Sequence, residues 1–385
     1  DRDERSTGLL GRAARIGGGA LLVGAAPAAM VAANVSPASA STLTVTNCND
    51  AGAGSLRWAV DAAGDGDVID FAGLGCSTIT LTTGQLAWDT ASTIDGPGRA
   101  NLTITANNAS RVFYVTGAGS GATTNHRLWD VTITGGTADV GGAIKSVDAS
   151  LTISGTTVTS NTATLWGGAI AAANSGPPGK DLTIADSSIA NNSAPQGGGV
   201  SGEYVRNFTL TANTIVSGNT ATGGSGGGIW LEKAQGTIDV RSGTSFDHNV
   251  ATGGGGASGG AIYIKDGQPT INLYHANFDH NSASSSGGAI FVDHVSANDP
   301  FTLYQSYFSY NSAGLDGGSI SVNYGTVSLT TQESTFDHDS AVGGGSIAAN
   351  RVAGSLTLNN TSITSSHASG LGGAINARYT DHVTL

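Results

Sequence analysis

The sequence predicts an all-β fold, a right-handed parallel β-helix in which short strands stack coil upon coil. A Gly-Gly-(small)-Ile/Val motif recurs nine times at intervals of about 29 residues. Within each interval, apolar and polar residues alternate with the period of two that strands require. Regular repeats of this length without a helical pattern are typical of a solenoid, here with three short strands in each coil.

Two columns of inward-facing residues define the coils. The first column is the aliphatic residue that ends each Gly-Gly motif, namely Ile144, Ile170, Val200, Ile229, Ile262, Ile290, Ile320, Ile347 and Ile375. A second predicted strand follows, with the inward pairs Leu151/Ile153, Leu182/Ile184, Phe208/Leu210, Ile238/Val240, Ile271/Leu273, Phe301/Leu303, Val327/Leu329 and Leu356/Leu358.

A third column places an asparagine three residues after an apolar residue. Its members are Asn161, Asn192, Asn219, Asn249, Asn281 and Asn311. We expect these side-chain amides to stack at one turn and to hydrogen-bond from coil to coil, as amides do in cross-β stacks. Asparagine also tolerates the left-handed backbone that such a turn needs. A row of polar contacts to a ligand is the alternative role.

The chain divides into three predicted parts. Residues 1–40 are expected to be a signal peptide, because Arg12 and Arg15 precede an apolar stretch and Ala38-Ser-Ala40 supplies a small-x-small cleavage pattern. An N-terminal membrane anchor is the alternative. Residues 41–128 are expected to form a cap and irregular first coils, and residues 129–385 the regular repeats. We expect the natural product to continue beyond Leu385, because the last repeat stops mid-coil.

The cap is expected to contain a short helix and a disulfide. Ser55 is a suitable N-cap for a helix at 56–63 whose apolar face could close the core. Strands are expected at 68–71, 78–81, 102–105, 112–115 and 128–133. Cys48 and Cys76 are the two cysteines of the chain. In an exported protein, a disulfide between them is favoured over a metal pair or free thiols.

Composition and charge narrow the possible functions. Glycine makes up 59 of the 385 residues, which suits a fold with many tight corners. Charged residues are only 11%, which suits rows of neutral polar side chains stacked from coil to coil. A net charge of −12 argues against nucleic acid and anionic membranes as partners. The expected mature chain contains no integral membrane segment, and no nucleotide-binding or hydrolase motif is present.

An Asp-His dipeptide recurs at one coil position. Asp247 and Asp279 are expected to stack on consecutive coils, and such carboxylates could hold a hard cation such as Ca²⁺. The row is interrupted by Ser309-Tyr310. A solvated turn whose Asp and His contact each other is therefore the preferred interpretation, and we predict no metal and no catalytic residue here.

One outward row is the main candidate for binding. The residue after the aliphatic anchor is Trp230, Tyr263 and Phe291 on three consecutive coils. If the alternation holds, these rings face solvent and form a platform for sugar rings or for a partner protein. Alternatively, the rings cover the sheet or lie under a loop such as 251–259.

The repeat pair resembles that of a known family. Gly-Gly-Ala-Ile together with Phe-x-x-Asn, as in Phe278 to Asn281, is similar to the repeats of the polymorphic outer-membrane proteins, which are surface β-helix passengers. The resemblance covers about residues 129–385. The N-terminal segment, including Gly54-Ser-Leu-Arg-Trp-Ala59, resembles the CSLREA-type segment that opens many secreted bacterial β-helix proteins, with Gly54 and Trp58 in place of its Cys and Glu.

These resemblances imply a secreted or cell-surface protein, in the cell envelope or the outer membrane if a C-terminal anchor exists, and often an adhesin or antigen. They supply no catalytic residue. The expected function is non-enzymatic binding of a glycan or protein through an exposed coil face. The alternative is a β-helix polysaccharide lyase or glycoside hydrolase, because β-helices often carry such sites. Ice or mineral binding through outward threonines is disfavoured because other residues interrupt the row.

Overall fold

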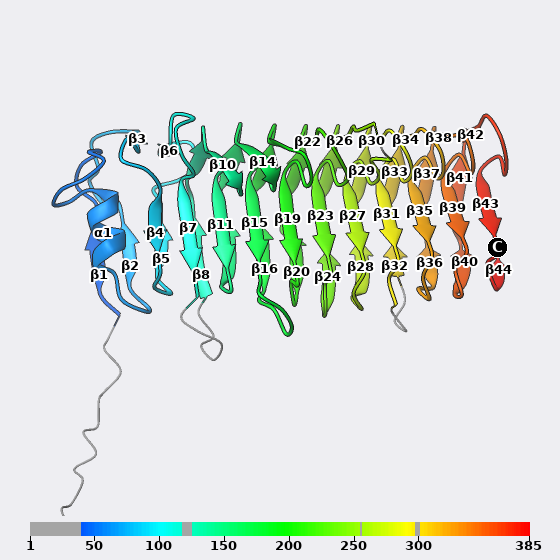
Figure 1. Ribbon diagram of the computed structural model, residues 1–385, viewed down its shortest axis with the longest axis horizontal. Coiled ribbons are helices and arrows are strands. Elements are labelled where there is room, and N and C mark those ends of the chain that lie inside the picture. Colours follow the sequence, from blue (N-terminus) through cyan, green and yellow to red (C-terminus); the bar gives the residue numbers. More distant parts are fainter. Residues whose placement is uncertain (1–39, 118–124, 255, 297–300) are drawn as a thin grey trace, which may run out of the picture. The chain divides into compact units, whose positions relative to one another are not determined.

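Residues 40–385 form one compact unit, a parallel β-solenoid (Figure 1). The computed structural model describes residues 40–117, 125–254, 256–296 and 301–385. The expected signal peptide, apart from its last residue, lies outside the described residues. Each strand pairs in parallel with the equivalent strand of the next coil, as in Ile262 with Ile290. The predicted β-helix of about 29 residues per coil is confirmed.

Four sheets run along the solenoid. Sheet A comprises β1 (Thr42–Thr44), β2 (Val68–Asp70), β5 (Thr93–Asp95), β8 (Asn125–Trp129), β12 (Ser150–Ser154), β16 (Leu182–Ala185), β20 (Phe208–Thr211), β24 (Thr237–Val240), β28 (Thr270–Tyr274), β32 (Phe301–Tyr304), β36 (Leu329–Gln332), β40 (Ser355–Asn359) and β44 (His382–Thr384). Sheet B comprises β3 (Thr78–Thr80), β6 (Thr103–Thr105), β9 (Thr132–Thr134), β13 (Thr157–Thr159), β17 (Ser188–Ala190), β21 (Ile215–Ser217), β25 (Ser245–Asp247), β29 (Asn277–Asp279), β33 (Tyr307–Ser309), β37 (Thr335–Asp337) and β41 (Ser362–Thr364).

The other two sheets contain the strands on either side of the Gly-Gly corner. Sheet C comprises β4 (Leu86–Trp88), β7 (Phe113–Thr116), β11 (Ile144–Val147), β15 (Ile170–Ala173), β19 (Val200–Glu203), β23 (Ile229–Glu232), β27 (Ile262–Lys265), β31 (Ile290–Asp293), β35 (Ile320–Asn323), β39 (Ile347–Asn350) and β43 (Ile375–Arg378). Sheet D comprises β10 (Thr137–Val140), β14 (Thr162–Trp166), β18 (Ser193–Ala194), β22 (Thr220–Ala221), β26 (Val250–Ala251), β30 (Ser282–Ala283), β34 (Ser312–Ala313), β38 (Ser340–Ala341) and β42 (His367–Ala368).

Sheets A, B and C are the three strand columns that the repeats predict. Sheet D is an addition to that expectation: in most coils it contributes a strand of only two residues, directly after the asparagine column. Its strands are too short to show an alternation in the sequence, which explains why the repeat pattern did not indicate them.

The core consists of the inward-facing residues of successive coils. In sheet B, Phe246, Phe278, Phe308 and Phe336 are fully buried and stack with ring centroids 4.6 to 4.7 Å apart. Burying each of these rings stabilises the fold by about 1.5 to 3 kcal/mol. Because the rings repeat at the coil spacing, every coil depends on its neighbours for much of its buried surface.

The N-terminal cap matches the expected helix. Helix α1 (Leu56–Ala62) begins at Ser55, whose Oγ accepts a hydrogen bond from the Trp58 backbone amide at 3.2 Å. Its face bearing Leu56, Ala59 and Val60 is buried and contacts β4. Cys48 and Cys76 form a disulfide with their Cα atoms 6.3 Å apart.

Two strand assignments from the sequence need correction. The expected strand 128–133 is two strands, β8 and β9, because Asp130 has a φ of 56° and turns the chain between them. The expected pair Val327/Leu329 is shifted by two residues, since Phe301 pairs with Leu329 and Leu303 with Thr331. A shift of two keeps the same side chains inward, so alternation could not distinguish the two registers.

Candidate functional site

The three outward aromatic residues lie side by side on sheet C. Trp230, Tyr263 and Phe291 are register partners on β23, β27 and β31, and they form a cluster of their own outside the main core. The rings of Tyr263 and Phe291 stack with centroids 5.5 Å apart. The sequence prediction that these residues occupy one row is therefore realised on three neighbouring coils.

The expected solvent exposure of these rings is wrong. Trp230 and Tyr263 are each 9% exposed and Phe291 is 6% exposed. The corner glycine of each coil lies against the base of the aromatic residue: a Cβ on Gly226 would lie 2.9 Å from Trp230 Cβ, and one on Gly259 would lie 3.0 Å from Tyr263 Cα. With less than a tenth of each residue exposed, the row is not an open platform.

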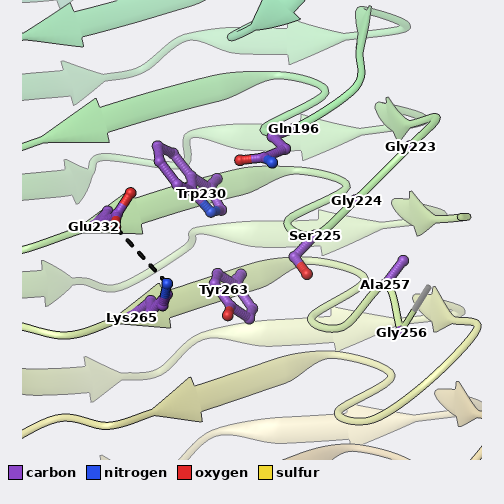
Figure 2. Close-up of a pocket in the computed structure, with 10 residues that line it drawn as sticks. All are labelled: Gln196, Gly223, Gly224, Ser225, Trp230, Glu232, Gly256, Ala257, Tyr263 and Lys265. Carbon is purple, nitrogen blue, oxygen red and sulfur yellow. Dashed lines mark ion pairs between the residues drawn. The ribbon is translucent and has the colours of Figure 1, made fainter.

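Two of the rings instead line a cleft, shown in Figure 2. This aromatic cleft has a volume of about 330 Å³ and is lined by Gln196, Gly223, Gly224, Ser225, Trp230, Glu232, Gly256, Ala257, Tyr263 and Lys265. The rings come from strands of sheet C, while the glycines and Ser225 come from the corner loops of two coils (Figure 2). Phe291 does not line it.

Charged groups mark one end of the aromatic cleft. Lys265 Nζ lies 3.9 Å from Glu232 Oε1, and this pair is drawn as a dashed line in Figure 2. Burial raises the pKa of the Tyr263 phenol above its ordinary value, and the nearby carboxylates of Asp293, Asp266 and Glu232 raise it further. The phenol therefore stays protonated at neutral pH and can donate a hydrogen bond.

Sequence reasoning found the rings but missed Gln196, Ser225 and the glycine walls. One signal was available. The interval from Ile229 to Ile262 is 33 residues, the longest of the series. Its additional residues fall in the corner loop that includes Gly256 and Ala257, which form one wall.

The asparagine column forms a buried ladder. Each of the six asparagines is 0 to 1% exposed, and each Nδ2 from Asn161 to Asn281 donates to Oδ1 of the next asparagine at 3.0 to 3.1 Å. The residue with positive φ is the one before the asparagine, such as His248 at 51°, so the left-handed role expected for asparagine is corrected. Because these amides are enclosed, they are not available to a ligand.

The Asp-His turns lie on the surface. His248 Nδ1 is 2.5 Å from Asp247 Oδ1, and His280 Nδ1 is 2.9 Å from Asp279 Oδ2. The two imidazoles stack with centroids 4.8 Å apart, and Tyr310 and His338 continue the stack. Ligand atoms of Asp247, His248 and His280 lie within 4.8 Å of one another. One carboxylate with two imidazoles does not suit Ca²⁺, which takes six to eight oxygens.

One comparison with known proteins agrees with the repeat pattern. Residues 276–293 match the Chlamydia polymorphic membrane protein repeat, across β29, β30 and β31. The chain carries a repeat of the polymorphic-membrane-protein type. This polymorphic-membrane-protein repeat includes Asn281 of the ladder and Phe291 of the aromatic row. No curated protein matches the chain in sequence.

Several solved β-helical proteins are similar to the chain at low identity. The A-modules of the mannuronan C-5 epimerases AlgE4 and AlgE6 of Azotobacter vinelandii are each 12% identical, with TM-scores of 0.39 and 0.41; each alignment covers 88% of this chain and 97% or 99% of the module. PfbA, a surface adhesin of Streptococcus pneumoniae, is 12% identical with a TM-score of 0.39, over 88% of this chain and 93% of PfbA. Across the described residues, no helix has the length and hydropathy to cross a membrane.

Proposed function

We propose that this protein is a secreted or cell-surface β-helix that binds glycans in the aromatic cleft without transforming them. The observation that carries the proposal is the convergence of two aromatic rings with Gln196, Ser225 and the Glu232–Lys265 pair around one cleft. The lining combines these two rings with several polar side chains and with glycine backbone, and placed polar groups are what orient a ligand in a small-molecule site. Sugars offer matching chemistry, because each ring has apolar C–H faces and a rim of hydroxyl groups.

The roles of the residues follow from their positions. The Trp230 and Tyr263 rings supply contact area at low conformational cost because burial already fixes them. The Gln196 amide and the Ser225 hydroxyl both donate and accept hydrogen bonds, as hydroxyl recognition requires. The glycine walls keep side chains out of the space beside the rings.

A location outside the cell is the second part of the proposal. The polymorphic-membrane-protein repeat and the expected signal peptide both support export. The two cysteines of the 385-residue chain form a disulfide, which also supports export because disulfides persist in oxidising compartments. A glycan-binding solenoid at the surface would act as an adhesin or as a receptor for soluble polysaccharide.

A glycan array with purified protein tests the binding function. We expect Tyr263→Ala and Gln196→Ala each to weaken binding to the best glycan by about tenfold or more. Phe291→Leu is the matched control, because Phe291 belongs to the same aromatic row yet does not line the cleft, and leucine keeps an apolar side chain against the Tyr263 ring. Equal binding by Tyr263→Ala and the parent would refute the proposal. Binding to cells without binding to any glycan would indicate a protein partner instead.

A glycoside hydrolase or lyase is the second candidate. Glu203 and Glu232 are register partners on β19 and β23, at a spacing near the roughly 5 Å between carboxylates of retaining glycosidases. Lysines pair with both carboxylates, and the raised pKa of Tyr263 keeps its phenol protonated at neutral pH, so that it is not available as a general base. Incubation with neutral and uronic-acid polysaccharides should therefore yield no new reducing ends and no unsaturated products.

A further inference from the structure

A second hollow adjoins the aromatic cleft. It has a volume of about 140 Å³, and we call it the tryptophan hollow because it is lined by Val140, Trp166, Ala171, Ala172, Ala173, Ser201, Glu203, Trp230 and Glu232. Trp230 and Glu232 line both spaces. Trp166, at the end of β14, is 41% exposed, so an indole face is accessible there.

The two spaces together form a track across four coils. The tryptophan hollow extends over β15, β19 and β23, and the aromatic cleft extends over β23 and β27. These strands are consecutive neighbours in sheet C. At the usual spacing between strands, the track is about 14 Å long in the direction of stacking, which is longer than a single sugar ring.

The tryptophan hollow has the chemistry of a cation site. Its charged lining residues are the carboxylates of Glu203 and Glu232, whose side chains are 37% and 20% exposed. Lys233 Nζ approaches them from outside the hollow, 3.1 Å from Glu203 Oε1 and 3.9 Å from Glu232 Oε1. Because Lys265 Nζ also lies 3.9 Å from Glu232 Oε1, the two carboxylates already hold two ammonium groups. Indole faces attract cations as well.

We propose that the ligand is a linear oligosaccharide bearing amino groups, which lies along the track and places one ammonium beside Glu203 and Glu232. The inference rests on the proposed glycan-binding function and adds the length and charge of the ligand. The net charge of −12 agrees with it, because the field of the protein attracts a cationic chain and repels a uronic-acid chain.

Calorimetry with two matched probes tests this inference. The probes are the tetramer of glucosamine and the tetramer of N-acetylglucosamine, which differ at each amino group, in buffer acidic enough to protonate the amine. We expect the parent protein to bind the amino tetramer about tenfold more tightly than the acetylated one. The glucosamine monomer should bind more weakly than its tetramer, because it occupies only part of the track.

Three variants assign the effect to the tryptophan hollow. Glu203→Gln, which keeps the shape of the side chain, should abolish the preference for the amino tetramer. Trp166→Ala should weaken the binding of both tetramers. Lys233→Ala should strengthen binding of the amino tetramer, because the ligand no longer competes with the lysine ammonium for Glu203.

The outcomes separate this inference from the proposed function. If both tetramers bind equally, or if Glu203→Gln retains the preference, the amino-group assignment is overturned. Sensitivity to Tyr263→Ala would then still support glycan binding. If neither tetramer binds, this inference is overturned as well, and the glycan array decides the proposed function independently.

Discussion

At the scale of single residues, the buried ladder ends on an acid. Asp339 follows Asn311 in the column, is fully buried, and accepts hydrogen bonds through Oδ1 from Asn311 N at 3.0 Å and from Asn311 Nδ2 at 3.3 Å. Burial raises the pKa of this carboxyl from 3.8 to about 6. An asparagine would offer the same oxygen without the charge, as the other members of the ladder do.

We therefore expect Asp339→Asn to stabilise the protein only when the acid would be ionised. The folded state binds the proton more tightly than the unfolded state, so the stability of the parent falls as pH rises from 3.8 to about 6. Above that range the variant should gain up to about 3 kcal/mol, and at acidic pH it should gain little. Urea unfolding across this pH range measures the difference. A gain that does not depend on pH would contradict the explanation, and Asp381→Asn, at an exposed position near the end of the chain, is the control.

At the scale of elements, the Gly-Gly corner brings backbones of neighbouring coils into contact. The first glycine has a positive φ, as at Gly259 with 66°. The second has no room for a side chain: a Cβ on Gly260 would touch the Gly288 carbonyl oxygen and lie 2.6 Å from Ser282 N and O. These are backbone atoms of the next coil, which cannot move aside without disturbing the stack. The corner therefore requires glycine for packing as well as for conformation.

Gly260→Ala should destabilise the protein by about 2 kcal/mol or more, as overpacking does in other cores. Gly75→Ala is the control, because a Cβ there meets nothing within 4 Å, and we expect it to change stability by less than about 0.5 kcal/mol. Thermal and urea unfolding of the two variants give the comparison. Equal stability of the two would show that the coils can separate locally at the corner.

At the scale of the whole molecule, each coil is a removable unit of a stack. Ile262 and Ile290 pair in register and are separated by 28 residues. Deleting residues 262–289 would bring Ile290 beside Ile229 and continue every sheet with one coil fewer. Because coils contact mainly their neighbours, the remainder keeps its core.

We expect the deletion of residues 262–289 to yield a folded, less stable protein that has lost Tyr263 and therefore glycan binding. Deleting only residues 262–275 should prevent folding, since it would set a strand of sheet C against one of another sheet. Circular dichroism and size-exclusion chromatography distinguish the two proteins. If the protein that lacks residues 262–275 has native strand content and unfolds cooperatively, this view of the stack is contradicted.

The sequence predicted those parts of the fold that leave a repeated or local pattern in it. The nine anchors, the asparagine column and the helix after Ser55 were predictable because each repeats or caps a local structure. The two-residue strands of sheet D left no pattern. The register at Leu329 was ambiguous because a shift of two residues satisfies the same alternation. In the candidate site, the rings were predictable, and their burial was not.

The sequence by itself determined that the chain winds into coils, which residues face inward, and that Trp230, Tyr263 and Phe291 share one row. These properties depend on period and spacing, which a sequence contains directly. The tertiary structure alone decided that the rings of this row are buried, that loops of two coils line the aromatic cleft, and that Glu203 and Glu232 meet in a second hollow. Such contacts join residues of different coils at irregular loops, and loop paths depend on packing between coils rather than on any repeat within one.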